Sequence, residues 1–305
     1  RVVRAQTTDR SAEKDVTERS MADMNRGLDL SVFETTTDSE SDQFRSFYAD
    51  KLGTPHRGLN FWLDVDRPDI LKRYRAFADD ATPGGLETVR KVGGFSFLVS
   101  YAMSGYAVGI RYLVHMWQTL GFSKAQVLEG LAVAFLYNGP RGSETVAEAL
   151  DGYEWIEPAA PAVFFDGWAP DPGAFSSGMD FSTREVLDGE MELLEDWYLR
   201  TIGEIPPYVA FLRQHRPQLL KSWRNRYENI LVELPKQVMP YSQLHFNVMR
   251  GWADGIRESV LLARAFGMTK EQVYEPLFSP MINTGPEAYS IVSQAAGDVL
   301  AADWT

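Results

Sequence analysis

The segment GIRESVLLARAFGMTKEQVYEPL, residues 255–277, repeats much of an earlier segment, GIRYLVHMWQTLGFSKAQVLEGL, residues 109–131. The two segments are 146 residues apart (255 − 109 = 146), and 10 of their 23 aligned positions are identical. A match at one constant offset is the sequence signature of a duplicated structural unit. We therefore expect two copies of one helical unit in this chain, packed about a pseudo-twofold axis.

Each copy carries the same signals for the ends of helices. An apolar helix ends at a glycine, where the C′ residue needs positive φ. The next helix begins at a hydroxyl residue with Gln three positions later, which is a capping box. These signals are Gly121, Ser123 and Gln126 in the first copy and Gly267, Thr269 and Gln272 in the second. A Gly-Pro pair follows in each copy, at 139–140 and 285–286, where proline can open a further helix. Strand-like alternation is missing, so we expect an all-α fold.

Composition divides the chain into four parts. Residues 1–66 are polar and rich in Thr, Ser, Asp and Glu, and we expect an N-terminal arm. The first repeat covers 67–151 and the second covers 182–305. Between them, 152–181 form a connector rich in proline and aromatic residues.

The connector is expected to be an ordered loop or lid rather than a flexible linker, because its large aromatic side chains need burial. These side chains are Trp155, Phe164, Phe165 and Trp168. After the connector, Ser182 and Glu185 have capping-box spacing and predict the start of a new helix.

The charge and cysteine content exclude several classes of function. A formal net charge of −12 disfavours binding to nucleic acid or to an anionic membrane surface. The chain has no cysteine, and its four histidines lack ligand spacing, so we expect neither thiol chemistry nor a metal site. The uncharged run 92–110 is interrupted by glycines, which favours buried helices over a membrane span. No signal peptide is visible at the N-terminus, and we expect a cytoplasmic protein.

The repeated unit, Gly-[Phe/Met]-[Ser/Thr]-Lys-x-Gln-Val-x-Glu-x-Leu followed by Gly-Pro, has a small-residue apolar helix before it. This pattern resembles the alkyl hydroperoxidase D-like superfamily, which includes the carboxymuconolactone decarboxylases. The resemblance covers about half of the chain. It implies a helical homo-oligomer, a dimer or trimer, with two units per chain.

Redox members of that superfamily carry a Cys-x-x-Cys-x-x-x-His relay with a glutamate upstream. The matching positions hold Pro240, Trp252, Gly255 and Ser259 in the second copy, and Gly94, Tyr106, Gly109 and Leu113 in the first. The relay is absent from both copies, so thiol peroxidase chemistry is excluded. The decarboxylase branch needs no cysteine, and the resemblance to it stands.

Differences between the copies indicate where a site lies. The second copy has gained polar groups, since Phe95, Val99, Val108, Tyr112 and Leu113 are replaced by Tyr241, His245, Asp254, Glu258 and Ser259. We expect a pocket beside this face. His245 is the predicted general acid/base because its ordinary pKa lies near neutrality. Tyr241 would donate to a developing enolate, and Asp254 would act with Glu258 as an acid/base pair.

Each of these residues also has a simpler interpretation. His245 could be a core histidine, Tyr241 an ordinary buried tyrosine, and the two acids solvated surface charges. The basic segment 215–230 is interpreted as a solvated amphipathic helix.

Five residues are candidates for substrate binding. Trp252 and Ser259 stand where the superfamily places reactive groups, and Arg257 could clamp a substrate carboxylate. Tyr106 of the first copy and Trp168 of the connector complete the set. A simpler role for Arg257 is an ion pair between helices, because Arg111 and Glu129 recur as Arg257 and Glu275.

The function expected from this resemblance and pattern is a cofactor-independent acid/base enzyme. It would be a decarboxylase- or isomerase-like lyase acting on a small organic acid or phenolic compound. A second hypothesis is a non-catalytic oligomer of the same fold that binds a ligand or a partner. A third is an enzyme that uses a metal or oxygen.

Overall fold

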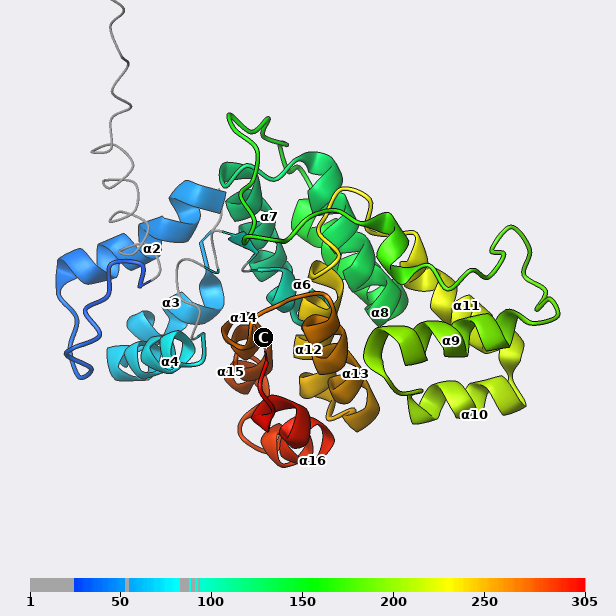
Figure 1. The fold of residues 1–305 in the computed structure, drawn as a ribbon. Helices are drawn as coiled ribbons and strands as arrows, with labels where there is room; N and C mark the ends of the chain where they lie inside the picture. Colours follow the sequence, from blue (N-terminus) through cyan, green and yellow to red (C-terminus); the bar gives the residue numbers. More distant parts are fainter. Residues whose placement is uncertain (1–24, 53–54, 83–87, 89–90, 93, 305) are drawn as a thin grey trace, which may run out of the picture. The chain divides into compact units, whose positions relative to one another are not determined.

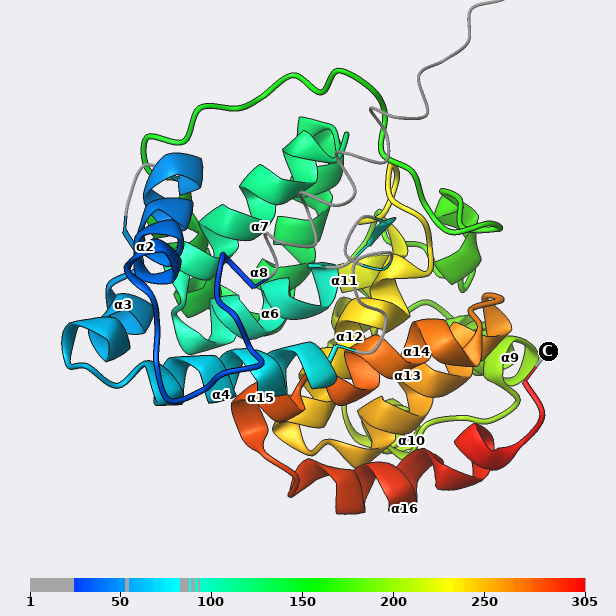
Figure 2. The same cartoon turned by 90° about the vertical axis from the view of Figure 1, so that its left-hand side faces the viewer.

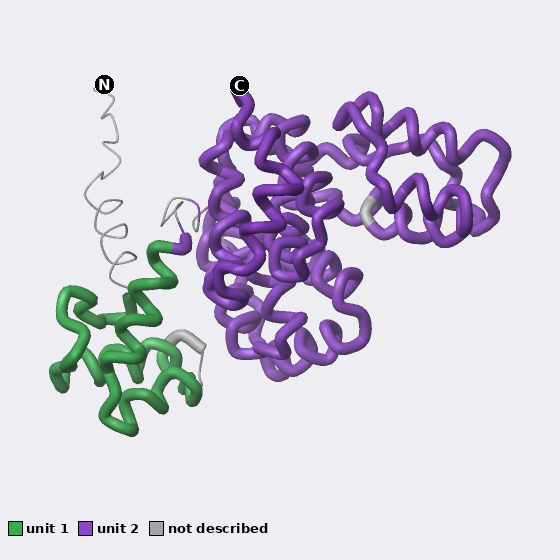
Figure 3. Tube along the Cα trace, turned by 90° about the horizontal axis from the view of Figure 1, so that it is seen from below, with its two compact units in different colours: residues 1–80 green, residues 81–305 purple. Residues whose placement is uncertain are grey.

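The structure is a computed structural model that describes residues 25–52, 55–82, 88, 91–92 and 94–304. In this part of the chain every helix or strand assigned is a helix, which confirms the predicted all-α class (Figure 1). An isolated antiparallel bridge joins Pro170 and Pro235. The chain divides into two compact units, residues 1–80 and 81–305 (Figure 3).

The described part of the first unit is helical and has its own small core. Its helices are α2 (Asp38–Leu52), α3 (Arg57–Asp64) and α4 (Pro68–Asp80). Phe44, Tyr48 and Leu71 are buried among them. The unit therefore extends past the predicted end of the arm at residue 66 and includes a helix that the sequence pattern assigned to the first repeat. Residues 1–24 of the predicted arm lie outside the described residues.

In the second unit, the helices whose bounds lie in the described residues surround a larger core. They are α6 (Phe95–Ser104), α7 (Ala107–Thr119), α8 (Lys124–Leu150), η1 (Pro172–Phe175), α9 (Glu190–Ile202), α10 (Pro207–His215), α11 (Pro217–Glu228), α12 (Val238–Arg250), α13 (Ala253–Ala265), α14 (Lys270–Phe278), α15 (Met281–Thr284) and α16 (Ala288–Ala301). Helix α6 packs against α8 and α12, α12 packs against α13, and α13 packs against α16 (Figures 1 and 2). Helices α9, α10 and α11 lie together at one side of this unit.

The helix ends recur at the offset read from the sequence. Both bounds of α7 and α13 differ by 146 residues (107 + 146 = 253 and 119 + 146 = 265). Both helices end in a Schellman motif. Gly121 N–H donates to the Gln118 carbonyl and Gly267 N–H to the Arg264 carbonyl, and in each case the N–H of the next residue donates to the carbonyl five positions before it. Both capping boxes that follow are formed, as predicted.

The Gly-Pro positions also share a backbone conformation. Gly139 has φ 63 and ψ −149, and Gly285 has φ 72 and ψ −169. The first glycine kinks α8 at Pro140, and the second separates α15 from α16. Helices α6 and α12 also end alike, at Gly105 and Gly251 in the left-handed region.

The predicted capping box at Ser182 and Glu185 is wrong. Helix α9 begins at Glu190, after Gly189, and the preceding segment forms turns. The reason is the Glu190 carboxylate, which accepts the backbone N–H groups of Asp180 and Leu187 at 2.7 Å and so fixes these turns.

The connector 152–181 is anchored along its length by specific contacts. The amide of Gln118 bonds both backbone groups of Ile156 and the hydroxyl of Tyr153. Trp168 and Phe175 are buried in the hydrophobic core of the second unit. Separately, no helix in the described residues is both long and apolar enough to cross a membrane.

Candidate functional site

A small cavity lies between α12 and α13 of the second copy and the helices α8, α10 and α11. The residues that line it are Tyr137, Tyr208, Trp223, Gln243, Asn247, Trp252 and Glu258. Gln243, Asn247 and Glu258 are buried and form a polar floor. The four aromatic residues are half-buried and form a rim.

Glu258 is the acidic group of this cavity, and two phenols hold its carboxylate. Tyr198 donates to Oε1 at 2.9 Å and Tyr208 donates to Oε2 at 2.9 Å. The two tyrosine oxygens are themselves 3.1 Å apart. Burial raises the pKa of Glu258, and the two tyrosine hydrogen bonds partly offset that rise. A buried carboxyl with a raised pKa beside a cavity is suited to taking up and releasing a proton.

Arg224 supplies positive charge behind this group. Its guanidinium stacks on the ring of Trp197 at 3.8 Å, and its Nε donates to Glu228 at 2.6 Å. Its charge lowers the pKa of Glu258 and so opposes the effect of burial. Arg224 and Lys221 are both buried and ion-paired. Segment 215–230 therefore includes an amphipathic helix, α11, whose exposed face holds Gln218, Ser222 and Asn225, but these two basic side chains are not solvated as predicted.

Asn247 has a fixed orientation on the cavity floor. Its Nδ2 donates to Ser259 Oγ at 3.1 Å, and that hydroxyl donates to the carbonyl oxygen of Gly255 at 2.7 Å. The close packing requires glycine at 255, because a Cβ there would lie 2.3 Å from the Trp252 ring and 2.7 Å from Asn247 Nδ2. The Asn247 Oδ1 atom is buried and has no hydrogen-bond partner in the described structure.

The cavity is narrow in this conformation. Its whole volume is about 10 Å³. One water molecule needs roughly this space together with two to four polar partners. The floor therefore accommodates a single hydroxyl- or water-sized group, and a larger ligand would extend over the aromatic rim.

The structure places two predicted substrate-binding residues at this site. Trp252 lines the cavity, with its ring 5.2 Å from that of Tyr208, and Ser259 orients Asn247. Glu258 had two interpretations from the sequence, a member of an acid/base pair or a solvated surface charge. Its side chain is buried at the cavity floor. Asn247 was missed, although it replaces the Tyr101 of the first copy (101 + 146 = 247).

The structure places His245 and Tyr241 elsewhere. His245 has no exposed surface, its Nδ1 is 2.9 Å from Ser279 Oγ, and its ring contacts that of Phe97. Burial lowers the pKa of His245 to about 3. Tyr241 is also fully buried, near the carboxyl group of Glu275, and burial raises the pKa of both groups, that of Glu275 to about 7. Neither His245 nor Tyr241 lines the cavity at Glu258.

The predicted ion pair between the recurring Arg and Glu residues is wrong. Arg257 forms a bidentate pair with Glu204 and a second pair with Asp298, so its guanidinium is already engaged. Arg111 instead donates to the carbonyls of Ala149 and Asp151. The two glutamates have other surroundings: Glu129 accepts three backbone N–H groups at residues 232–234, and Glu275 is buried.

The other predicted site residues lie outside the cavity lining. Asp254 is half-buried in the first turn of α13, where its charge raises the pKa of Glu258. Tyr106 packs on Tyr101, with 4.9 Å between ring centroids. Trp168 donates to Gln272 and contacts the Tyr241 ring, and no residue of the connector lines the cavity.

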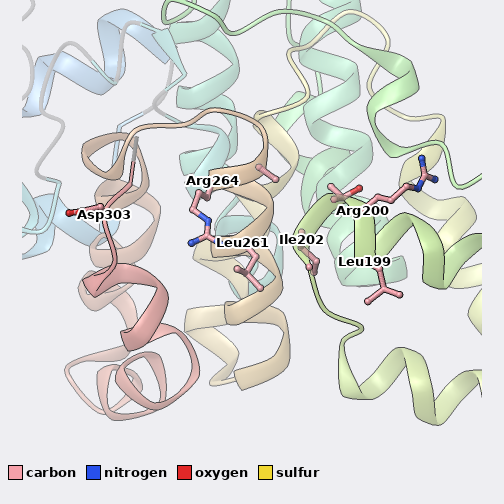
Figure 4. Close-up of a pocket in the computed structure, with 9 residues that line it drawn as sticks. Leu199, Arg200, Ile202, Leu261, Arg264 and Asp303 are labelled. Atoms are coloured by element: carbon pink, nitrogen blue, oxygen red, sulfur yellow. The ribbon is translucent and has the colours of Figure 1, made fainter.

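A second, more open cleft lies between the ends of α9 and α13 (Figure 4). Its lining includes Arg200 and Arg264, whose side chains extend in different directions in this view. The two charges do not converge on one position, so this cleft is the weaker candidate for a site.

The described residues contain no group of three or more histidine, aspartate or glutamate side chains placed to hold a metal ion. Comparison of the chain with protein-family models, with curated proteins and with solved structures finds no match. The chemistry of the cavity at Glu258 is thus the main guide to function.

Proposed function

We propose that this chain is a cofactor-independent acid/base enzyme whose proton-transferring group is Glu258. The observation that carries the proposal is a buried carboxyl of raised pKa, held by Tyr198 and Tyr208, at the floor of an aromatic-rimmed cavity. Its substrate would be a small phenolic compound or organic acid, and the reaction an isomerisation or a decarboxylation.

In an isomerisation, the Glu258 carboxylate takes a proton from carbon next to a carbonyl group, leaving an enolate. The resulting carboxylic acid returns the proton to another carbon of the same enolate, so no external reductant or oxidant is needed. In a decarboxylation, the carboxylic acid protonates the carbanion that remains after carbon dioxide leaves. The Tyr208 phenol donates its one proton to Glu258 and so holds the reacting carboxyl group at the cavity.

We also propose that the second unit holds two copies of one helical unit, related by a pseudo-twofold axis and similar to the alkyl hydroperoxidase D-like superfamily. The shared bounds of α7 and α13 and the shared glycine conformations support the duplication. A homo-oligomer remains part of this proposal, and native mass spectrometry of the purified protein would report its subunit number.

A non-catalytic ligand-binding protein is the second candidate, and the size of the cavity favours it. With room for about one water-sized group, the cavity is smaller than most enzyme pockets, which measure roughly 300–1,000 Å³. The enzyme proposal requires a substrate that places only one small group on the floor, or aromatic rim residues that move on binding.

The test is proton exchange in D₂O, followed by proton NMR with phenylpyruvate, acetoacetate and 4-hydroxyphenylacetone. Loss of a C–H signal reports proton exchange, and conversion of acetoacetate into acetone reports decarboxylation. We expect Glu258→Gln to lower the rate about 10²- to 10⁴-fold, as loss of a general acid/base does. The exposed Glu271, also in the second copy, provides a matched control, and Glu271→Gln should react like the unaltered protein.

A second variant separates catalysis from folding. Tyr208→Phe removes a hydrogen bond that lowers the pKa of Glu258, so the pH–rate profile should shift to higher pH. Unchanged exchange in Glu258→Gln would contradict the proposed role of this residue. If none of the three compounds reacts, the ligand-binding candidate is favoured.

A further inference from the structure

The starting point is the unsatisfied carbonyl of Asn247. A serine hydroxyl has one proton, and Ser259 gives its proton to the Gly255 carbonyl. Ser259 must therefore accept from Asn247, which places the NH₂ group against the serine and leaves Oδ1 as an acceptor. Because Oδ1 is buried without a partner, it destabilises the folded chain unless a donor reaches it.

The charge of the lining limits what that donor can be. Of the residues that line the cavity, Glu258 is the one with a carboxyl group, and none is lysine, arginine or histidine. An anionic ligand would meet this carboxyl and the Asn247 carbonyl without a lining cation to offset the repulsion. Arg257, the predicted carboxylate clamp, is already paired with Glu204 and Asp298.

The rim disfavours a cationic ligand and suits an uncharged aromatic one. The guanidinium of Arg226 already lies 4.1 Å from the centre of the Trp223 ring and 5.1 Å from that of Tyr137. Those two rings therefore face a cation within the chain, and a second cation nearby would be repelled. Trp252 and Tyr208 remain half-buried at the rim, where an aromatic ring can pack on them.

We propose that the cavity selects an uncharged phenol, whose hydroxyl enters the floor and donates to Asn247 while its ring packs on the rim. Asn247 is then the residue that determines specificity. This inference rests on the same site as the proposed function, and it narrows the ligand class from phenols and organic acids to phenols. The whole cavity admits one hydroxyl-sized group, so in this pose the ring of the phenol lies outside it, against the rim.

The first copy provides an internal comparison. The positions of Asn247, Glu258 and Ser259 are occupied there by Tyr101, Tyr112 and Leu113. These side chains include neither a carboxamide nor a carboxylate, so the same acceptor pair cannot form. We therefore expect one phenol site per chain.

The test compares three ligands of similar size by isothermal titration calorimetry: phenol, anisole and benzoate. Anisole keeps the ring and oxygen but lacks the hydroxyl proton, and benzoate carries a negative charge. The 305-residue chain should bind phenol at least about tenfold more tightly than either, since a buried polar site rejects an analogue that leaves it unpaired. Equal binding of phenol and anisole, or tighter binding of benzoate, would overturn the proposal.

Two variants test whether Asn247 causes the preference for phenol over anisole. Asn247→Leu removes the acceptor, and the ratio of anisole to phenol dissociation constants should fall close to one. Ser259→Ala keeps Asn247 but frees its amide to rotate, so the same ratio should fall while circular dichroism and melting remain near those of the unaltered protein. A folded Asn247→Leu protein with an unchanged ratio contradicts the proposal. If that variant does not fold, the ratio in the unaltered protein and in Ser259→Ala decides.

These outcomes are independent of turnover. A phenol preference without proton exchange would support the selectivity and contradict the enzyme proposal. Exchange that depends on Glu258, together with equal binding of phenol and anisole, would contradict the selectivity alone.

Discussion

At the scale of single residues, burial decides which group can move a proton. His245 was the predicted general acid/base because the ordinary pKa of histidine is near neutral. Its complete burial lowers that pKa to about 3, so the imidazole stays neutral at physiological pH and is a weak base. For Glu258 burial has the opposite effect, because the charged form of a carboxyl is the anion.

His245 should make the fold sensitive to acid. The unfolded chain binds a proton below about pH 6.5, while the folded state does so only near pH 3. The stability contributed by the neutral histidine is therefore present above pH 6.5 and is lost as pH falls toward 3, by at most about 1.36 kcal/mol per pH unit. We expect His245→Asn to lose less free energy of unfolding than the unaltered protein over this range.

Urea unfolding at pH 7.5, 6.5, 5.5 and 4.5 measures this difference. The comparison with the variant is essential, because Glu275, whose pKa is raised to about 7, acts in the opposite sense. Its contribution is present below pH 4.5 and is lost as pH rises toward 7. Parallel pH dependence in the two proteins would show that His245 titrates normally.

At the scale of helices, one motif occurs twice in different surroundings. Gly121 and Gly267 both end a helix with positive φ, at 102 and 76. A Cβ on Gly121 would lie 2.5 Å from the Ala160 carbonyl oxygen and 2.7 Å from the Ala162 nitrogen, both in the connector. Gly267 has open space at the same position. Gly121 therefore also provides a docking point for the connector, whose Ala162 N–H donates to the Gly121 carbonyl at 2.9 Å.

The same substitution should therefore have different effects in the two copies. Gly267→Ala should cost about 1–2 kcal/mol, which is the strain of a left-handed alanine. Gly121→Ala should cost about 1–3 kcal/mol more, because the connector backbone must also shift. Denaturant unfolding of both variants measures this difference. Equal losses would mean that the connector does not pack tightly on Gly121.

At the scale of the whole molecule, each unit has its own core, and a buried lysine organises the first. The Nζ of Lys72 donates to the carbonyls of Val32 and Thr35 and pairs with Glu40 at 2.7 Å. Burial raises the pKa of Glu40, but the hydrogen bonds from Lys72 and from backbone N–H groups outweigh it, and the pKa falls to about 2. The Glu40 carboxylate therefore stays ionised over the whole physiological range.

Lys72→Met should loosen the first unit without loosening the second. Removing one partner of a buried ion pair costs about 3–5 kcal/mol. Hydrogen exchange followed by mass spectrometry should show faster exchange in peptides from 29–80 and no change in peptides from 94–304. The neighbouring Arg73 is the matched control, since its pair with Glu34 is exposed and Arg73→Met should cost less than about 1 kcal/mol. Equal loosening of both regions would contradict the division into two units.

The sequence by itself determined the features that depend on neighbouring residues. The all-α class, the Schellman glycines and the two capping boxes follow from side chains within a few positions of each other. Comparison of the two copies also predicted a pocket beside the face of the second copy that carries Trp252 and Ser259. The failed capping box at Ser182 has a long-range cause, since Glu190 and its partner Lys221 hold that segment in turns.

Only the tertiary structure decided which polar residues are buried and what they contact. Glu258 became the candidate acid because Tyr198 and Tyr208, 60 and 50 residues away in the chain, meet its carboxylate from α9 and α10. His245 is no longer the candidate general acid/base, because helices remote from it in sequence exclude all solvent from its side chain. The physical reason is that desolvation and hydrogen bonding set a pKa, and both depend on residues that are adjacent in space but remote in sequence.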